Sequence, residues 1–137
     1  MAAFVIAHWY LFVALMIVGG LLVAGPAIEA NSGVGRVTSQ EAVQIINRQT
    51  ALVLDVREPQ EFQTGHIARA VNIPLGQVAA RAQELKKYKD KPVIVVCASG
   101  ARSARAASLL HKEGFTDVRN LAGGIKAWRD LNLPTVS

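Results

Sequence analysis

An uncharged stretch near the start of the chain limits what this sequence can fold into. The first formal charge is Glu29, and residues 3–28 contain no Asp, Glu, Lys or Arg. At about 1.5 Å of rise per residue, a helix over this stretch would be longer than the hydrocarbon core of a bilayer, which is about 30 Å thick. A helix also satisfies its own backbone polar groups, as a membrane-spanning segment must. The sequence therefore predicts a transmembrane helix over residues 3–28, with the lipid bilayer as its partner.

A cleaved signal peptide is the alternative for this stretch. No Lys or Arg precedes the apolar residues, and cleavage after Ala30 would place the bulky Ile28 where a small side chain is required. Arg36 follows the stretch and nothing basic precedes it, which favours a cytoplasmic location for the rest of the chain. The single cysteine agrees with a reducing compartment. We expect a single-pass protein of the cell membrane with its main domain on the cytoplasmic side.

The residues after this stretch have the pattern of one α/β domain. With 137 residues, 51% of them hydrophobic, the composition excludes collagen-like and disordered classes and suffices for one small domain. Residues 29–35 indicate a short flexible linker, and the domain is expected over residues 36–134. Predicted strands alternate with predicted helices, which is typical of a parallel sheet with helices on both faces. The expected strands are residues 51–54, 71–73, 93–96 and 117–121. The expected helices are residues 59–63, 78–85 and 103–111. Two further helices are expected, one that begins at a cap formed by Thr38 and Glu41 and one that ends at Trp128.

The basic balance of the chain does not point to nucleic acid. The sequence has 15 Lys+Arg against 10 Asp+Glu, a formal net charge of +5. Four of these lysines lie between residues 86 and 91, where Tyr88 and Asp90 interrupt them. Such a mixed stretch is typical of a solvated surface turn. We therefore expect no nucleic-acid partner.

A candidate reactive site follows the strongest predicted strand. Residues 93–96 run directly into Cys97, and a loop of small residues follows before the next predicted helix. Small side chains let the backbone curl with its N–H groups inward, which makes a nest for an anion. The dipole of the next helix and the Arg102 charge also favour thiolate over thiol. We expect Cys97 to be a nucleophile with a lowered pKa, in an anion cradle formed by Ala98, Ser99, Gly100, Ala101, Arg102 and Ser103. A buried structural cysteine is the alternative.

A second strand end carries charged residues. Asp55 follows the predicted buried strand at residues 51–54. The carboxyl ends of parallel strands lie at the same edge of a sheet, so Asp55 is expected at the edge that holds Cys97. We expect Asp55 and Arg57 to pair and support the loop rather than to act in catalysis. His66 lies in a Gly-His-Ile turn that favours a structural role. No spacing typical of a metal site or of a phosphate-binding lysine loop is present, so no metal or other cofactor is predicted.

Several groups of residues resemble the rhodanese family, in the same order along the chain. They are Leu54-Asp55-Val56-Arg57-Glu58, Glu61-Phe62, Gly65-His66-Ile67, Ala70, Asn72-Ile73-Pro74, Val95-Val96-Cys97 with Gly100, Arg102 and Ser103, and Gly114-Phe115, Val118, Leu121, Gly123-Gly124 and Trp128. The likeness covers about residues 36–134. It implies a membrane-anchored sulfurtransferase with a rhodanese-like fold. Cys97 would take a sulfane sulfur from a small-molecule donor, hold it as a persulfide and deliver it to a thiol or protein acceptor, without a cofactor.

Two other functions stay open. The domain could be a sulfur-carrier or interaction module at the membrane that turns over little. It could also be a cysteine-based phosphatase or arsenate reductase, although the phosphatases that resemble this arrangement use Cys-x5-Arg, and the spacing from Cys97 to Arg102 is Cys-x4-Arg. Ala98 and Ser99 are uncharged, whereas cationic side chains at these positions accompany thiosulfate use in some family members. A strong preference for thiosulfate is therefore not expected.

Overall fold

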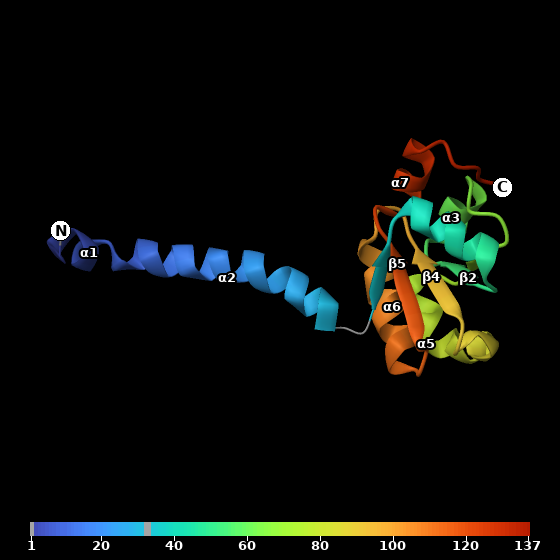
Figure 1. The fold of residues 1–137 in the computed structure, drawn as a ribbon, viewed down its shortest axis with the longest axis horizontal. Coiled ribbons are helices and arrows are strands. Elements are labelled where there is room, and N and C mark those ends of the chain that lie inside the picture. The colour runs from blue at the N-terminus through green and yellow to red at the C-terminus, as the bar shows by residue number, and fades with distance from the viewer. Residues whose placement is uncertain (1, 32–33) are drawn as a thin grey trace. The chain divides into compact units, whose positions relative to one another are not determined.

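The computed structural model divides the chain into two compact units. It describes residues 2–31 and 34–137, with side chains described for residues 2–20 and 34–137. The first unit is Met1–Ser32 and the second is Gly33–Ser137. Each unit is considered by itself, and the second one holds all the strands that the structure describes (Figure 1).

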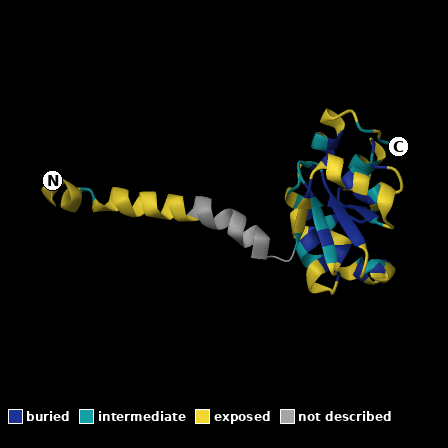
Figure 2. Ribbon diagram, in the orientation of Figure 1, coloured by how far each residue is buried: buried dark blue, intermediate teal, exposed yellow. Residues whose placement is uncertain are grey.

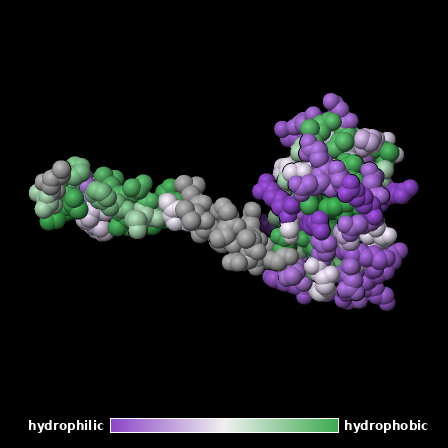
Figure 3. All heavy atoms as spheres, viewed as in Figure 1, coloured by the Kyte–Doolittle hydropathy of each residue, from purple (hydrophilic) through white to green (hydrophobic). Residues whose placement is uncertain are grey.

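The first unit consists of helices α1 (Ala2–Ala7) and α2 (Trp9–Asn31). A turn at His8 separates them, and its ring Nδ1 lies 3.0 Å from the Phe4 carbonyl oxygen. The described apolar side chains of these helices are exposed (Figures 2 and 3). Within the portion of the chain that the structure describes, no helix combines the length and apolarity needed to cross a membrane. The side chains of residues 21–28, the second part of the predicted span, lie outside the described residues.

The linker predicted over residues 29–35 needs correction. Residues 29–31 continue α2, and Gly35 begins strand β1 (Gly35–Val37). Val34 already packs against the core of the second unit. The strand was missed because Gly35-Arg36-Val37 is too short to show an apolar pattern; its partner, Arg119 opposite Gly35, lies far along the sequence. Ser32 and Gly33 lie outside the described residues.

Five parallel strands form the sheet of the second unit. They are β1, β2 (Leu52–Asp55), β3 (Val71–Asn72), β4 (Pro92–Val96) and β5 (Asp117–Leu121), in the order β1-β5-β4-β2-β3. Each residue of β2 and β4 is buried, as expected for strands covered on both faces. This confirms the predicted α/β class with a parallel sheet.

Helices cover both faces of the sheet because successive strand residues point to opposite sides. Leu54 and Val95 belong to one core cluster, with residues from α5 (Val78–Arg81) and α6 (Ala101–Lys112). Val53 and Ile94 belong to the other, with residues from α3 (Ser39–Arg48) and α7 (Gly124–Asp130). The remaining helical segments are α4 (Pro59–Gln63) and the 3-10 turns η1 (Leu75–Gln77) and η2 (Ala82–Tyr88).

Two helix predictions differ in detail from the structure. The helix expected over residues 78–85 is one turn of α-helix that continues as the 3-10 segment η2. Helix α6 begins at Ala101, two residues earlier than predicted, so Arg102 and Ser103 belong to its first turn. The loop after Cys97 is therefore shorter than its small residues suggested. The Thr38 cap of α3 is confirmed, since its hydroxyl accepts from the Glu41 N–H at 3.2 Å.

The Gly123-Gly124 turn packs directly against the strand end that carries Cys97. The Ile125 N–H donates to the Cys97 carbonyl at 2.9 Å, and the Lys126 N–H donates to the Ala98 carbonyl at 3.2 Å. Gly124 has a φ of +58°, and a Cβ there would overlap the Cys97 carbonyl and lie 2.7 Å from the Ala98 carbonyl carbon. Only glycine fits this approach without strain.

We predict that Gly124→Ala lowers the free energy of unfolding by about 2–4 kcal/mol, because left-handed strain and backbone overlap add together. Urea unfolding followed by circular dichroism measures the change. Gly76→Ala is the matched control: no atom lies within 4 Å of its added Cβ, and the expected change is within about 0.5 kcal/mol. Equal stabilities for the two variants would contradict the prediction.

Candidate active site

The Cys97 sulfur lies where the central strand β4 ends, and it is held by donors from the following loop and helix. The Gly100 N–H donates to Sγ at 3.0 Å, and the Ser103 hydroxyl donates to it at 3.3 Å. Gly100 has a φ of +109°, which lets the chain turn back toward the sulfur before α6 begins. Cys97 is 1% exposed.

These donors favour the thiolate. Burial raises the pKa of the Cys97 thiol, but hydrogen bonds from the Ser103 hydroxyl and from the N–H groups of Ser103, Gly100 and Ser99 lower it, and the net pKa is below its usual value. The positive end of the α6 dipole acts in the same direction. The direction agrees with the sequence prediction, although its main causes are neutral donors rather than a cation.

Ser103 is in turn positioned by a residue that the sequence analysis missed. Its hydroxyl lies within hydrogen-bond distance of the Asn120 Oδ1 and of the Gly100 carbonyl, the latter at 3.1 Å. The Asn120 Nδ2 donates to the same Gly100 carbonyl at 3.1 Å, which fixes the orientation of the amide. Asn120 therefore ties β5 to both donors of the sulfur. Its signal in the sequence was a polar side chain inside a predicted strand.

Arg102, which was predicted to add its charge to the cradle, forms an ion pair with Glu61. The guanidinium Nη1 and Nη2 donate to the two Glu61 carboxylate oxygens at 2.7 and 2.9 Å. The Arg102 hydrogen bond is the main reason that the pKa of Glu61 is lowered to about 2. Sequence analysis gave Glu61 no role, because its partner lies 41 residues away. The pair joins α4 to the first turn of α6.

Asp55 and Arg57 form the pair that the sequence predicted. Nε and Nη2 of Arg57 donate to the Asp55 carboxylate at 2.8–3.1 Å, and Nη2 also donates to the Gly65 carbonyl at 2.8 Å. Both side chains are buried. The Asn72 amide donates to the carbonyls of Asp55 and Arg57 at 3.0 and 2.9 Å. Since Asp55 lies opposite Val96 in the sheet, this network supports the strand end beside Cys97.

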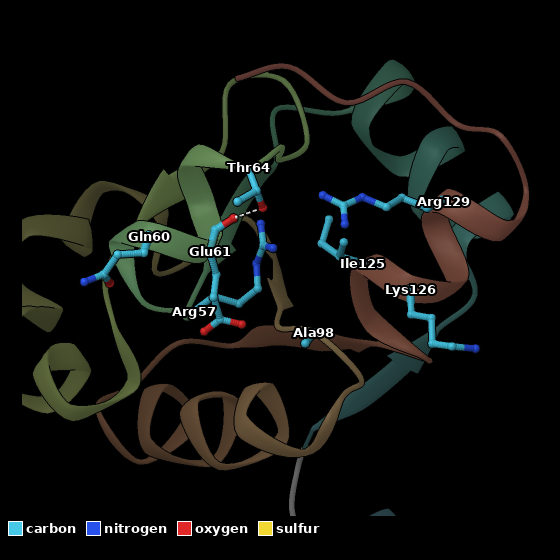
Figure 4. Close-up of a pocket in the computed structure, with 8 residues that line it drawn as sticks. All are labelled: Arg57, Gln60, Glu61, Thr64, Ala98, Ile125, Lys126 and Arg129. Atoms are coloured by element: carbon cyan, nitrogen blue, oxygen red, sulfur yellow. Dashed lines mark hydrogen bonds between the residues drawn. The ribbon is translucent and has the colours of Figure 1, made fainter.

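A cavity of about 450 Å³ opens beside the loop (Figure 4). Of the predicted cradle residues, Ala98 lines it, while the side chains of Ser99 and Ala101 are exposed. The other lining residues are Arg57, Gln60, Glu61, Thr64, Ile125, Lys126 and Arg129. Within the described residues, no group of three His, Cys, Asp or Glu side chains could hold a metal ion.

His66 has the structural environment that its turn predicted. Its ring stacks on Phe62 with the centroids 3.6 Å apart, and its Nδ1 lies 2.8 Å from the Phe62 carbonyl oxygen. Its backbone also forms a bridge with Val136 near the C-terminus. These contacts tie the α4 region to the end of the chain.

Comparison with known proteins identifies this arrangement. The family model described as the rhodanese-like domain matches residues 38–131. The chain belongs to the rhodanese-like domain family. It is 42% identical over 101 residues to YibN of Escherichia coli K12, which covers 73% of this chain and 71% of that protein. It is 38% identical over 89 residues to the thiosulfate sulfurtransferase GlpE of Pseudomonas syringae, covering 65% and 82%.

A solved structure of this family has the same fold. It is the rhodanese-related protein of Thermoplasma volcanium, with a TM-score of 0.67 and 34% identity over 74% of this chain and 97% of that chain. The family match over residues 38–131 includes strands β2, β3, β4 and β5 and the loop after Cys97. The rhodanese-like identity of the domain, expected from the residue pattern, is thereby confirmed.

We predict that Ser103→Ala raises the pKa of Cys97, because burial remains while the Ser103 hydroxyl is lost. The ultraviolet absorbance of the thiolate, titrated with pH and corrected with Cys97→Ala, measures the shift. Cys97 is the single cysteine of the chain, so the signal has one source.

Ser108→Ala is the matched control for this titration. It removes the same hydroxyl from the same helix α6 without removing a donor to the sulfur. Its titration midpoint is expected to equal that of the unaltered chain. A midpoint for Ser103→Ala that stays in place or moves to lower pH would refute the assigned role.

Proposed function

We propose that this protein is a sulfurtransferase that carries a sulfane sulfur as a persulfide on Cys97. The observation that supports the proposal most directly is the pair of donors on the Cys97 sulfur, Gly100 N–H at 3.0 Å and Ser103 O–H at 3.3 Å, at the start of α6. They favour an anionic sulfur in a loop whose next residue, Ala98, lines a cavity. Family membership and the similarity to a named thiosulfate sulfurtransferase point to the same chemistry.

The first half-reaction loads the cysteine. The Cys97 thiolate attacks the sulfane sulfur of a donor such as thiosulfate, a new S–S bond forms, the donor's S–S bond breaks, and sulfite leaves with the bonding electron pair. The product is a persulfide whose terminal sulfur is anionic. The loop N–H groups and the Ser103 hydroxyl are donors that suit such an anion, in the way an oxyanion hole suits oxygen.

The second half-reaction unloads it. A nucleophilic acceptor, cyanide in an assay or a thiolate, attacks the terminal sulfur, and the bond between that sulfur and Sγ breaks. Cys97 leaves as thiolate, so the donors that stabilised it at the start assist its departure. Neither half-reaction needs a metal or an organic cofactor, because each is a direct displacement at sulfur by a nucleophile that is already anionic.

A sulfur carrier with low turnover is the second candidate. The 1% exposure of Cys97 favours it, because a buried sulfur exchanges slowly unless a partner opens the site. A carrier and an enzyme share the persulfide and differ in steady-state rate. A phosphatase is favoured less, because the spacing from Cys97 to Arg102 is short and Arg102 is engaged by Glu61.

We predict that Cys97→Ala abolishes sulfur transfer from thiosulfate to cyanide, measured as thiocyanate formed. The unaltered chain incubated with thiosulfate should gain the mass of one sulfur atom, and dithiothreitol should remove it. Undiminished transfer by Cys97→Ala would exclude the proposal. A stable adduct with negligible turnover would favour the carrier, and hydrolysis of an aryl phosphate would favour the phosphatase.

We also propose, from the sequence, that residues 3–28 attach the protein to the cell membrane with the domain on the cytoplasmic side. The absence of charge in this stretch and the exposed apolar side chains described up to Val18 support the proposal. A double variant in which both Leu15 and Ile17 are changed to Arg should be released from the membrane fraction, since each charge at the bilayer centre costs about 2.5–3.5 kcal/mol. Replacing both with Phe should leave it there. Recovery of the unaltered chain in the soluble fraction would contradict the attachment.

A further inference from the structure

Four lysines gather in the short segment that leads into the central strand β4. They are Lys86, Lys87, Lys89 and Lys91, from the end of η2 to the residue before β4. The Thr116 N–H and hydroxyl both donate to the Lys89 carbonyl, at 2.9 and 3.1 Å, and the Lys91 N–H donates to the Tyr88 carbonyl at 3.0 Å. The four lysines therefore project from an ordered turn that is tied to the start of β5.

Tyr88 holds two of these side chains on the outer surface of the turn. Its ring packs against the core cluster that contains Phe115 and Val118. The amines of Lys87 and Lys91 lie 5.2 and 5.8 Å from the centroid of this ring. Cation–π attraction at these distances keeps both charges beside one anchored aromatic ring.

A fifth lysine comes from the end of α6. Lys112 is exposed in the last turn of this helix. The Lys89 amine reaches the residues that follow the helix, since it lies 3.9 Å from the position that a Cβ on Gly114 would take. We call the five residues Lys86, Lys87, Lys89, Lys91 and Lys112 the lysine surface.

Nearby carboxylates compensate only part of this charge. Glu84 is paired with Arg81, and Asp117 with Arg119. In the part of the chain that the structure describes, no ion pair includes a member of the lysine surface. Asp90 and Glu113 are the other carboxylates of these segments, so five positive charges against two negative ones leave a net charge of three.

The chain enters the sheet at the edge where the lysine surface lies. Because the strands are parallel, β1, β5 and β4 begin at one edge, at residues 35, 117 and 92. We call it the amino edge. Strand β5 lies between β1 and β4, so their starts are about 10 Å apart across the sheet. Val34, just before β1, packs against the same core cluster as Tyr88. The fold thus brings lysines that are distant in sequence from residues 3–28 to the edge where the chain from those residues enters the domain.

We propose that the lysine surface binds the anionic phospholipid headgroups of the membrane to which residues 3–28 attach. The inference rests on the proposed membrane attachment and assigns the face of the domain that meets the bilayer. Gly35 follows Ile28 by seven residues, which span at most about 25 Å when fully extended, so the chain keeps the amino edge near the headgroups. Clustered lysines are attracted to an anionic leaflet when they come within a Debye length of it, about 8 Å at physiological salt.

This contact leaves the reactive cysteine exposed to dissolved substrates. Strand β4 runs from Pro92, next to Lys91, to Val96, and Cys97 follows at its carboxyl end. The five residues of this strand span about 17 Å. Headgroups bound at the amino edge therefore lie at the opposite edge of the sheet from the Cys97 loop and the cavity that Ala98 lines.

The test separates the lysine surface from the apolar stretch by using residues 34–137 alone. Both core clusters of the second unit consist of residues from Val34 onward, and the Thermoplasma relative matches over 97% of its own length, so this fragment is expected to fold. It should sediment with vesicles of equal parts phosphatidylcholine and phosphatidylglycerol and stay in solution with phosphatidylcholine alone. Raising the salt from about 0.1 to 1 M shortens the Debye length from about 10 to 3 Å and should release it.

Paired variants test which charges bind the vesicles. Lys86→Gln combined with Lys87→Gln should weaken binding about 25-fold, since each lysine near an anionic surface contributes roughly fivefold. Changing the same two residues to Arg should preserve binding, because the attraction depends on charge. Arg105→Gln combined with Lys126→Gln is the matched control: it removes two exposed charges near the starts of α6 and α7, at the other edge of the sheet, and should bind like the unaltered fragment. Circular dichroism checks that each variant folds.

Three results would overturn the proposal. Equal binding to neutral and anionic vesicles would show that headgroup charge is not recognised. Equal loss in the two double variants would show a dependence on net charge alone. Absence of vesicle binding, with binding of a single-stranded RNA that Lys86→Gln and Lys87→Gln abolish, would assign the lysine surface to nucleic acid instead.

Fractionation of the full chain keeps this proposal distinct from the membrane attachment on which it rests. If the full chain stays in the membrane fraction at about 1 M salt but the fragment does not bind anionic vesicles, the lysine proposal is wrong and the attachment stands. If the fragment binds as described but the same salt extracts the full chain, the lysine surface stands and attachment by residues 3–28 is wrong.

Discussion

Hydrogen bonds that end on one sulfur atom determine what this fold does. Buried at 1% exposure, Cys97 would be a neutral and unreactive thiol in the absence of donors, because burial raises its pKa. The Gly100 N–H and the Ser103 hydroxyl reverse that effect. Both donors depend on the rest of the domain: Asn120 of β5 holds Ser103 and the Gly100 carbonyl, and the Gly124 turn holds the carbonyls of Cys97 and Ala98.

The charges around the sulfur are arranged in compensated pairs. Asp55 pairs with Arg57, two residues further along the chain, and Glu61 of α4 pairs with Arg102 of α6. A neutral loop stabilises the anion through short, directed bonds rather than through a cation in contact with it.

The sequence predicted the parts of this design that are local. Composition and spacing reveal features whose residues are close together in the sequence. Three features are of this kind: the apolar residues before Cys97, the small residues after it, and the Asp55-Arg57 pair. Contacts between distant segments left no comparable signal. Glu61 and Arg102 are 41 residues apart, Ser103 and Asn120 are 17 apart, and β1 is defined only by its pairing with β5. The early start of α6 followed the same rule, because tertiary packing rather than propensity fixed the first turn.

The balance between burial and hydrogen bonding suits both halves of the proposed sulfur-transfer cycle. Attack on a donor needs a thiolate that is still a good nucleophile, and nucleophilicity falls as thiol pKa falls. Unloading needs Cys97 to be a good leaving group, which improves as its pKa falls. A cation in contact with the sulfur would favour departure at the expense of attack. Here neutral donors lower the pKa, which favours departure, while burial opposes them and limits the loss of nucleophilicity.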